Sequence, residues 1–201
     1  MKFSPIGNSL KGIINYIYPI YKDNYDKIVT VQPSSTSGKE TNWRSEALII
    51  PTRTSTQMCD SWASDAVPNS WFMVHFHKHL ISISHYSMRT QSNHSVDHPK
   101  SWKIEGSLDG ENWNPIDSKN NYPELDGPNL LRTFKVTNKG RYSYFKVTQT
   151  DVNNDDHNDF DLSKIEFFGT LVDLQSFPLI CSNKGIKGMH KLIFAIMFVI
   201  C

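Results

Sequence analysis

The sequence predicts an all-β fold, an antiparallel sandwich or barrel, from three observations. Short runs rich in aromatic and β-branched residues recur along the chain. Clusters of turn-forming residues separate these runs, among them Asp109-Gly110 and Asn138-Lys-Gly140. No long amphipathic helical pattern competes with the strands, so the apolar faces must be buried by sheets packing on sheets.

Eight or nine strands are expected, with the clearest runs at residues 28–31, 47–50, 71–76, 81–88, 102–108, 130–136, 142–148 and 162–168. The run at 102–108 shows the clearest alternation, because Trp102, Ile104 and Leu108 share one face and the polar residues between them share the other. The last strand alternates in the same way and is expected to turn Lys164 and Glu166 outward. One core should therefore join strands that are distant in sequence.

Three histidines, His75, His77 and His79, continue the pattern of the strand at 71–76. Their parity is opposite to that of the apolar residues, which places the imidazoles on the solvent face. Two histidines at i and i+2 lie near 7 Å apart and can hold zinc, but a catalytic site also needs a third ligand and a cleft. We interpret the stretch as a surface strand and expect no metal there.

Composition limits the class of protein. The chain has 201 residues, 38% of them hydrophobic, which suits one domain with short tails. Its net charge is +1 and it contains no basic run, so no nucleic-acid partner is expected. Three scattered cysteines form no C-x-x-C pair, and the N-terminus lacks the continuous apolar run of a signal peptide. A cytoplasmic location is therefore expected.

The chain divides into a linker-like segment over 1–27, the sandwich over 28–171 and a tail over 172–201. The last ten residues, 192–201, are all apolar. As a helix they would extend only ~15 Å, half of a hydrocarbon core of about 30 Å, so a spanning helix is not predicted. A packing segment, a weak membrane anchor and a truncated chain remain open alternatives.

An acidic loop at 151–161 has ligand-type residues at spacings resembling an EF-hand, namely Asp151, Asn153, Asp155 and Asp159. The sixth position is Asp156, where the sharp turn needs glycine, and the twelfth is Leu162, where a bidentate glutamate belongs. We interpret this loop as a solvated acidic turn. The sequence also lacks G-x-S-x-G, Walker and H-E-x-x-H motifs, so no enzymatic activity and no cofactor are expected.

The order of several motifs resembles the coagulation factor 5/8 type C, or discoidin-like, domain over residues 28–171. The motifs are Trp62-x-Ser-Asp65, Pro68-Asn-Ser-Trp71 leading into Val74-x-Phe76, His85-Tyr-Ser-Met-Arg89, Pro99-Lys-Ser-Trp-Lys-Ile-Glu-Gly-Ser-x-Asp-Gly-x-x-Trp113 and Leu162-Ser-Lys-Ile-Glu-Phe-Phe-Gly169. The stretch from Trp102 to Trp113 is the most specific, because it combines a tight Asp-Gly hairpin with an expected core aromatic residue on the return strand.

This resemblance implies an eight-stranded antiparallel jelly-roll sandwich of the galactose-binding-domain-like type, with short non-core terminal segments and no catalysis. The chain resembles the intracellular copies found beside BTB domains and in large protist families. That similarity favours recognition of a protein partner, with lectin-like carbohydrate binding as the alternative. The polar loops lack the apolar residues that would insert into lipid.

In a sandwich of this family, the loops at 34–44, 59–65 and 89–98 would meet at one end and form a rim for a ligand. The candidate binding residues are Asn42, Arg44, Asp60, Arg89, His94 and His98. Such side chains hydrogen-bond sugar hydroxyls or protein groups equally well. The alternative for each residue is a solvated loop position without a binding role. Some relatives carry a structural calcium elsewhere, and that possibility is also left open.

Overall fold

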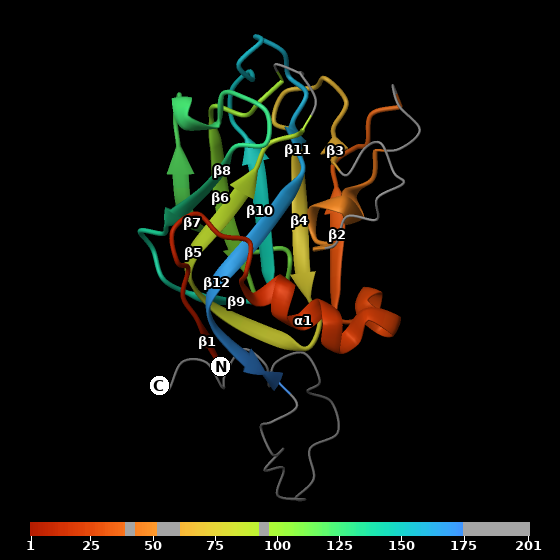
Figure 1. Cartoon of the computed structure of the whole chain (residues 1–201), viewed down its shortest axis with the longest axis vertical. Helices are drawn as coiled ribbons and strands as arrows, with labels where there is room; N and C mark the ends of the chain where they lie inside the picture. The colour runs from red at the N-terminus through yellow and green to blue at the C-terminus, as the bar shows by residue number, and fades with distance from the viewer. Residues whose placement is uncertain (39–42, 52–60, 93–96, 175–201) are drawn as a thin grey trace, which may run out of the picture.

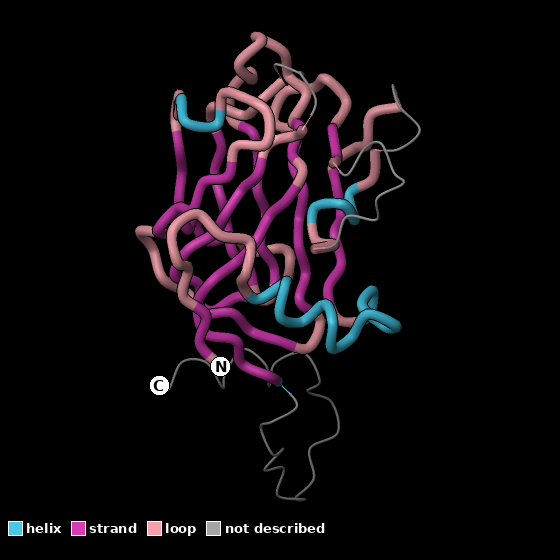
Figure 2. Tube along the Cα trace, in the orientation of Figure 1, coloured by secondary structure: helices cyan, strands magenta, loops and turns pink. Residues whose placement is uncertain are grey.

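The computed structural model describes residues 1–38, 43–51, 61–92 and 97–174. Two antiparallel sheets of five strands each pack face to face (Figures 1 and 2). The first sheet has the order β1 (Lys2–Phe3), β12 (Lys164–Asp173), β5 (His79–Arg89) and β8 (Leu131–Lys135), with β9 (Arg141–Tyr142) also paired to β5. The second has the order β2 (Val29–Pro33), β4 (Trp71–Phe76), β10 (Tyr144–Gln149), β6 (Trp102–Ser107) and β7 (Asn114–Lys119). The predicted all-β sandwich is confirmed.

The remaining elements are short. β3 (Trp62–Ala63) pairs with β11 (Asp161–Leu162), and the helices are α1 (Ile13–Tyr21), η1 (Lys22–Lys27), η2 (Ser45–Leu48) and η3 (Pro123–Leu125). In the part of the chain that the structure describes, no helix combines the length and apolarity that a membrane crossing requires.

The core lies between the two sheets, where aromatic side chains meet. Phe145 of β10 lies 4.7 Å from Phe167 of β12, measured between ring centroids, and Phe76 of β4 contacts the same ring edge-on. Phe72, Val74 and Phe76 are fully buried. The alternation predicted for this strand is therefore correct.

Two strand predictions need correction. Residues 47–50 do not form a strand, because Ser45–Leu48 is a 3₁₀ turn whose Ala47 and Leu48 are buried. A short apolar run can also form a buried turn, and the periodicity of such a run does not distinguish a turn from a strand. Conversely, β7 was not predicted, since Ile116 and Asp117 are its only buried residues.

Trp113 was expected in the core and is instead half-buried. The ammonium group of Lys146, which lies on β10, sits 4.1 Å from the centroid of the indole ring. β6 ends at Ser107, so the alternation that fixes the face of Trp102 does not extend through the turn to Trp113. The strand-parity argument fails where the strand stops.

His79 also departs from the expected pattern. His77 is exposed, as predicted, and His75 is half-buried with its ring stacked on that of Tyr144. His79 is buried near Tyr21 of the N-terminal region. The chain turns between β4 and β5 and passes from the second sheet to the first. His79 thus belongs to a different sheet from the two histidines before it.

The N-terminal segment, which the sequence placed outside the core, packs against β12. β1 pairs with β12 at Thr170 and Gly169, and Ile13, Ile14 and Ile17 of α1 are buried in the core cluster. This contact covers the outer face of β12.

Two charged residues of β12 are buried under that cover. The carboxylate of Glu166 accepts hydrogen bonds from the backbone N–H groups of Ile14 (2.8 Å) and Asn15 (2.9 Å). The Lys164 ammonium donates to the carbonyl of Ala47 at 2.7 Å. Both side chains point away from the sandwich core, as the alternation predicted, but the N-terminal segment and η2 exclude them from solvent.

Candidate functional site

Several loops gather at the end of the sandwich that lies opposite the N-terminus (Figure 1). The N–H of Ser37 donates to the carbonyl of Ala63 at 2.9 Å, and the N–H of Arg44 donates to the carbonyl of Ser61 at 3.4 Å. The Ser61 hydroxyl in turn accepts a hydrogen bond from the side-chain amide of Gln91 at 3.1 Å. The described parts of the three predicted rim loops therefore meet.

Further contacts bring two more loops to the same end. The hydroxyl of Thr90 donates to the carbonyl of Gly127 at 2.6 Å, and the N–H of Gly127 donates to Nδ1 of His98 at 3.0 Å. The carbonyl of His98 accepts hydrogen bonds from the backbone and side chain of Asn154, both at 3.0 Å. The rim is thus a hydrogen-bonded assembly of loops.

Of the six candidate rim residues, Asn42, Asp60 and His94 lie outside the described residues. Arg44 is exposed and immediately precedes η2. Arg89 is half-buried at the end of β5, where its Nε donates to the hydroxyl of Ser163 at 3.0 Å. Arg44 is therefore the better placed of the two arginines to reach a ligand.

His98 is buried, with 2% of its surface exposed. Burial lowers the pKa of its imidazole, and the Asp126 carboxylate, 3.8 Å away, opposes that shift. With Nδ1 accepting from Gly127, the side chain holds neighbouring loops together. His98 has little surface to offer a ligand, so its contribution to the rim is positional.

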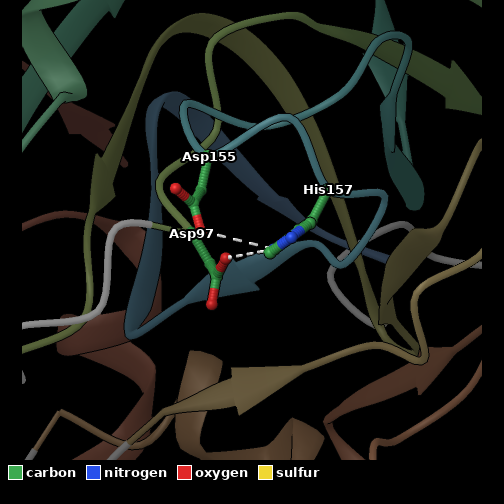
Figure 3. Close-up of side chains that lie close together, drawn as sticks. All are labelled: Asp97, Asp155 and His157. Carbon is green, nitrogen blue, oxygen red and sulfur yellow. Dashed lines mark hydrogen bonds and ion pairs between the residues drawn. The ribbon is translucent and has the colours of Figure 1, made fainter.

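A cluster that the sequence did not predict lies at the same end of the sandwich. Figure 3 shows the imidazole of His157 pointing at two carboxylates, Asp97 and Asp155. Its Nδ1 lies 3.4 Å from Oδ1 of Asp97 and 3.5 Å from Oδ2 of Asp155. Asp97 is half-buried, whereas Asp155 and His157 are exposed. Three metal-ligating side chains from two loops therefore converge.

Asn153, which is fully buried, positions this cluster. Its side-chain oxygen accepts the N–H groups of Asp155 and His157, each at 3.0 Å, and its amide donates to Asp97 at 3.2 Å. The EF-hand-like spacing therefore reflects a turn held by Asn153. The signal available in the sequence was the aspartate-rich loop, but nothing in it pointed to Asp97.

Two antiparallel sheets with polar loops gathered at one end define a galactose-binding-like β-sandwich, the class to which discoidin-like binding domains belong. The chain belongs to the F5/8 type C domain family, whose model matches residues 30–163. No curated protein sequence matches the chain significantly.

Solved structures of the same fold include domains from Clostridium perfringens and Bacteroides fragilis. One is the module CpGH89CBM32-5 from Clostridium perfringens, solved with GalNAc-β-1,3-galactose, with 14% identity, a TM-score of 0.56, and 70% of this chain and 94% of that chain covered. Another is the family 32 carbohydrate-binding module of C. perfringens NanJ, solved with galactose, with 12% identity, a TM-score of 0.53, and 70% and 93% covered. A third is the C-terminal domain of a chitobiase from Bacteroides fragilis, with 20% identity, a TM-score of 0.55, and 73% and 95% covered.

These neighbours correct one expectation from the sequence. A protein partner was ranked above a glycan, but two of the solved modules were determined in complex with sugars, one with galactose and one with GalNAc-β-1,3-galactose. The ranking rested on the expected lack of a signal peptide and on similarity to intracellular copies of the domain, and neither bears on the chemistry of the loops. The order of the two alternatives is therefore wrong.

Proposed function

We propose that this chain is a non-catalytic, lectin-like module that binds carbohydrate through the loops at the end of the sandwich opposite the N-terminus. The observation that carries the proposal is the hydrogen-bonded polar rim, built on a fold whose solved examples include modules in complex with galactose and GalNAc-β-1,3-galactose. A rim whose loops are already joined loses little conformational freedom on binding.

The chemistry of the described rim suits a sugar. Saccharides present many hydroxyl groups, and charged or polar side chains recognise them by donating and accepting hydrogen bonds. Exposed Arg44 offers several donors, and half-buried Trp43 beside it provides an aromatic group. Ser34, also exposed, adds a hydroxyl in the adjoining loop. Both kinds of group that sugars require are present at one end.

We predict that the full chain binds galactose or GalNAc-β-1,3-galactose in isothermal titration calorimetry, and that Arg44→Ala weakens the affinity about tenfold or more. Loss of a hydrogen bond from a charged donor typically has an effect of this size. Arg44 is exposed, so the melting temperature should stay unchanged.

Lys103→Ala is the matched control, because it also removes a surface cation. Lys103 lies on the outer face of the second sheet, where its ammonium contacts Glu105 at 3.1 Å. The Lys103→Ala variant should bind sugar with the affinity of the unmodified chain. The proposal is wrong if a broad glycan array shows no saccharide signal, and the rim assignment is wrong if Lys103→Ala abolishes binding while Arg44→Ala does not.

A further inference from the structure

The cluster of Asp97, Asp155 and His157 brings three side chains of metal-binding type together, with one long hydrogen bond from His157 to Asp97 and a long contact to Asp155. The two contacts of His157 Nδ1, at 3.4 and 3.5 Å, are longer than the range of about 2.7–3.2 Å typical of hydrogen bonds. The three donor atoms nevertheless lie within 4.8 Å of one another. The three side chains are therefore close enough to bind one small cation together, and their direct contacts with one another are long.

A zinc ion fits that spacing. Zinc binds histidine nitrogen and carboxylate oxygen at about 2.0–2.2 Å in a tetrahedron, in which neighbouring ligand atoms are about 3.3–3.5 Å apart. The distances from Nδ1 to both carboxylates match this tetrahedral edge. Calcium prefers an all-oxygen shell, so the imidazole nitrogen selects a transition metal.

The surroundings favour a cation and hold its ligands in place. The loop over 151–161 contains five aspartates and no lysine or arginine. Metal sites depend on a second layer of groups that orient the ligands. Asn153 does this here, because its buried side chain bonds to the carboxylate of Asp97 and to the backbones of Asp155 and His157. Asp97 and His157 therefore keep their relative positions without metal.

We propose that Asp97, Asp155 and His157 form a zinc-binding site at the loop end of the sandwich. Three protein ligands leave a fourth position of the tetrahedron, which is open to solvent because Asp155 and His157 are exposed. The proposal does not depend on carbohydrate binding. Its test contains no saccharide, so either proposal can fail without the other.

The test is an isothermal calorimetric titration of the full, metal-free chain with zinc chloride. One zinc ion should bind, and Asp155→Asn and His157→Gln should each weaken its affinity about tenfold or more, since each removes a ligand. Asp156→Asn is the matched control. It makes the same change of charge in the same loop, at a carboxylate that contacts Lys100 instead of the cluster.

A control separates zinc binding at the cluster from zinc binding at His75 and His77. A chain carrying His75→Thr and His77→Thr should retain the zinc ion that His157→Gln loses. Cobalt(II) gives a second measurement on the unmodified chain. Bound in a tetrahedral site with imidazole and carboxylate ligands, cobalt(II) absorbs visible light, and this absorption should disappear when zinc displaces the cobalt. Melting curves recorded without metal show whether each variant is folded.

Three results would overturn the proposal. First, an absence of zinc uptake by the unmodified chain would leave the direct contacts of His157 with the two carboxylates as the explanation of the cluster. Second, zinc binding by both Asp155→Asn and His157→Gln with the affinity of the unmodified chain would show that these side chains are not ligands. Third, binding of calcium without binding of zinc would show that the imidazole is not a ligand.

Discussion

Trp102→Ala is expected to lower the free energy of unfolding by about 3–5 kcal/mol, the range observed when a buried large aromatic residue is truncated. The indole is fully buried and packs edge-on against Phe134, 5.4 Å away, and Tyr122, 5.8 Å away, between ring centroids. Its removal would leave a cavity between the two sheets. Urea unfolding curves measure the effect.

A buried polar chain adds to the cost. The Trp102 indole N–H donates to the hydroxyl of Tyr86 at 3.0 Å, and that hydroxyl donates to Asp117 at 3.0 Å. Burial, reinforced by the charge of Asp117, raises the pKa of Tyr86 well above its ordinary value, so the phenol remains protonated and continues to donate. Without the indole, the buried Tyr86 oxygen loses its donor.

Trp113→Ala is the matched control, since it removes the same side chain eleven positions later in the sequence. Trp113 is half-buried and contributes mainly its contact with the Lys146 ammonium, so a loss of about 1 kcal/mol is expected. Equal losses of stability for the two tryptophan variants would contradict the placement of Trp113 outside the core.

Glu166→Gln is expected to change how stability depends on pH. Burial raises the pKa of the Glu166 carboxyl from 4.5 to about 7, against the opposing effect of its hydrogen bonds from backbone N–H groups. Between pH 4.5 and 7 the folded chain therefore retains a proton that the unfolded chain releases. The contribution of Glu166 to stability falls by about 3 kcal/mol as the pH rises through this interval, and it stays constant above.

The difference in unfolding free energy between the unmodified chain and Glu166→Gln isolates this effect, because glutamine does not titrate. Buried histidines such as His79, whose pKa burial lowers, shift stability in the opposite direction and cancel in the difference. Glu124→Gln, at an exposed carboxylate on the surface, is the control. If the difference between the unmodified chain and Glu166→Gln did not vary with pH, Glu166 would be ionised at all these pH values.

The strand pattern could be predicted because it depends on local alternation. Phe72, Val74 and Phe76 on one strand and Trp102 and Ile104 on another are buried as predicted, since a strand turns alternate side chains to opposite faces. The same rule failed for Trp113 and His79, which lie beyond the ends of the strands that suggested their orientation.

The candidate site could be predicted only in part. The sequence indicated which loops meet, and the described segments do meet through Ser61 and Gln91. It did not show that His98 would be buried between loops, or that Asp97 would join Asp155 and His157. A resemblance places loops by topology, whereas the direction of a side chain in a loop depends on its tertiary contacts.

The sequence by itself determined the class of fold, the faces of the regular strands and the family, because these follow from period-two alternation, turn residues and ordered motifs. Only the tertiary structure decided which polar residues are buried. Lys164 and Glu166 alternate away from the core as a surface pair would, yet η2 and the N-terminal segment cover them. The physical reason is that alternation specifies a direction relative to one sheet, whereas burial depends on whatever distant part of the chain packs on the other face.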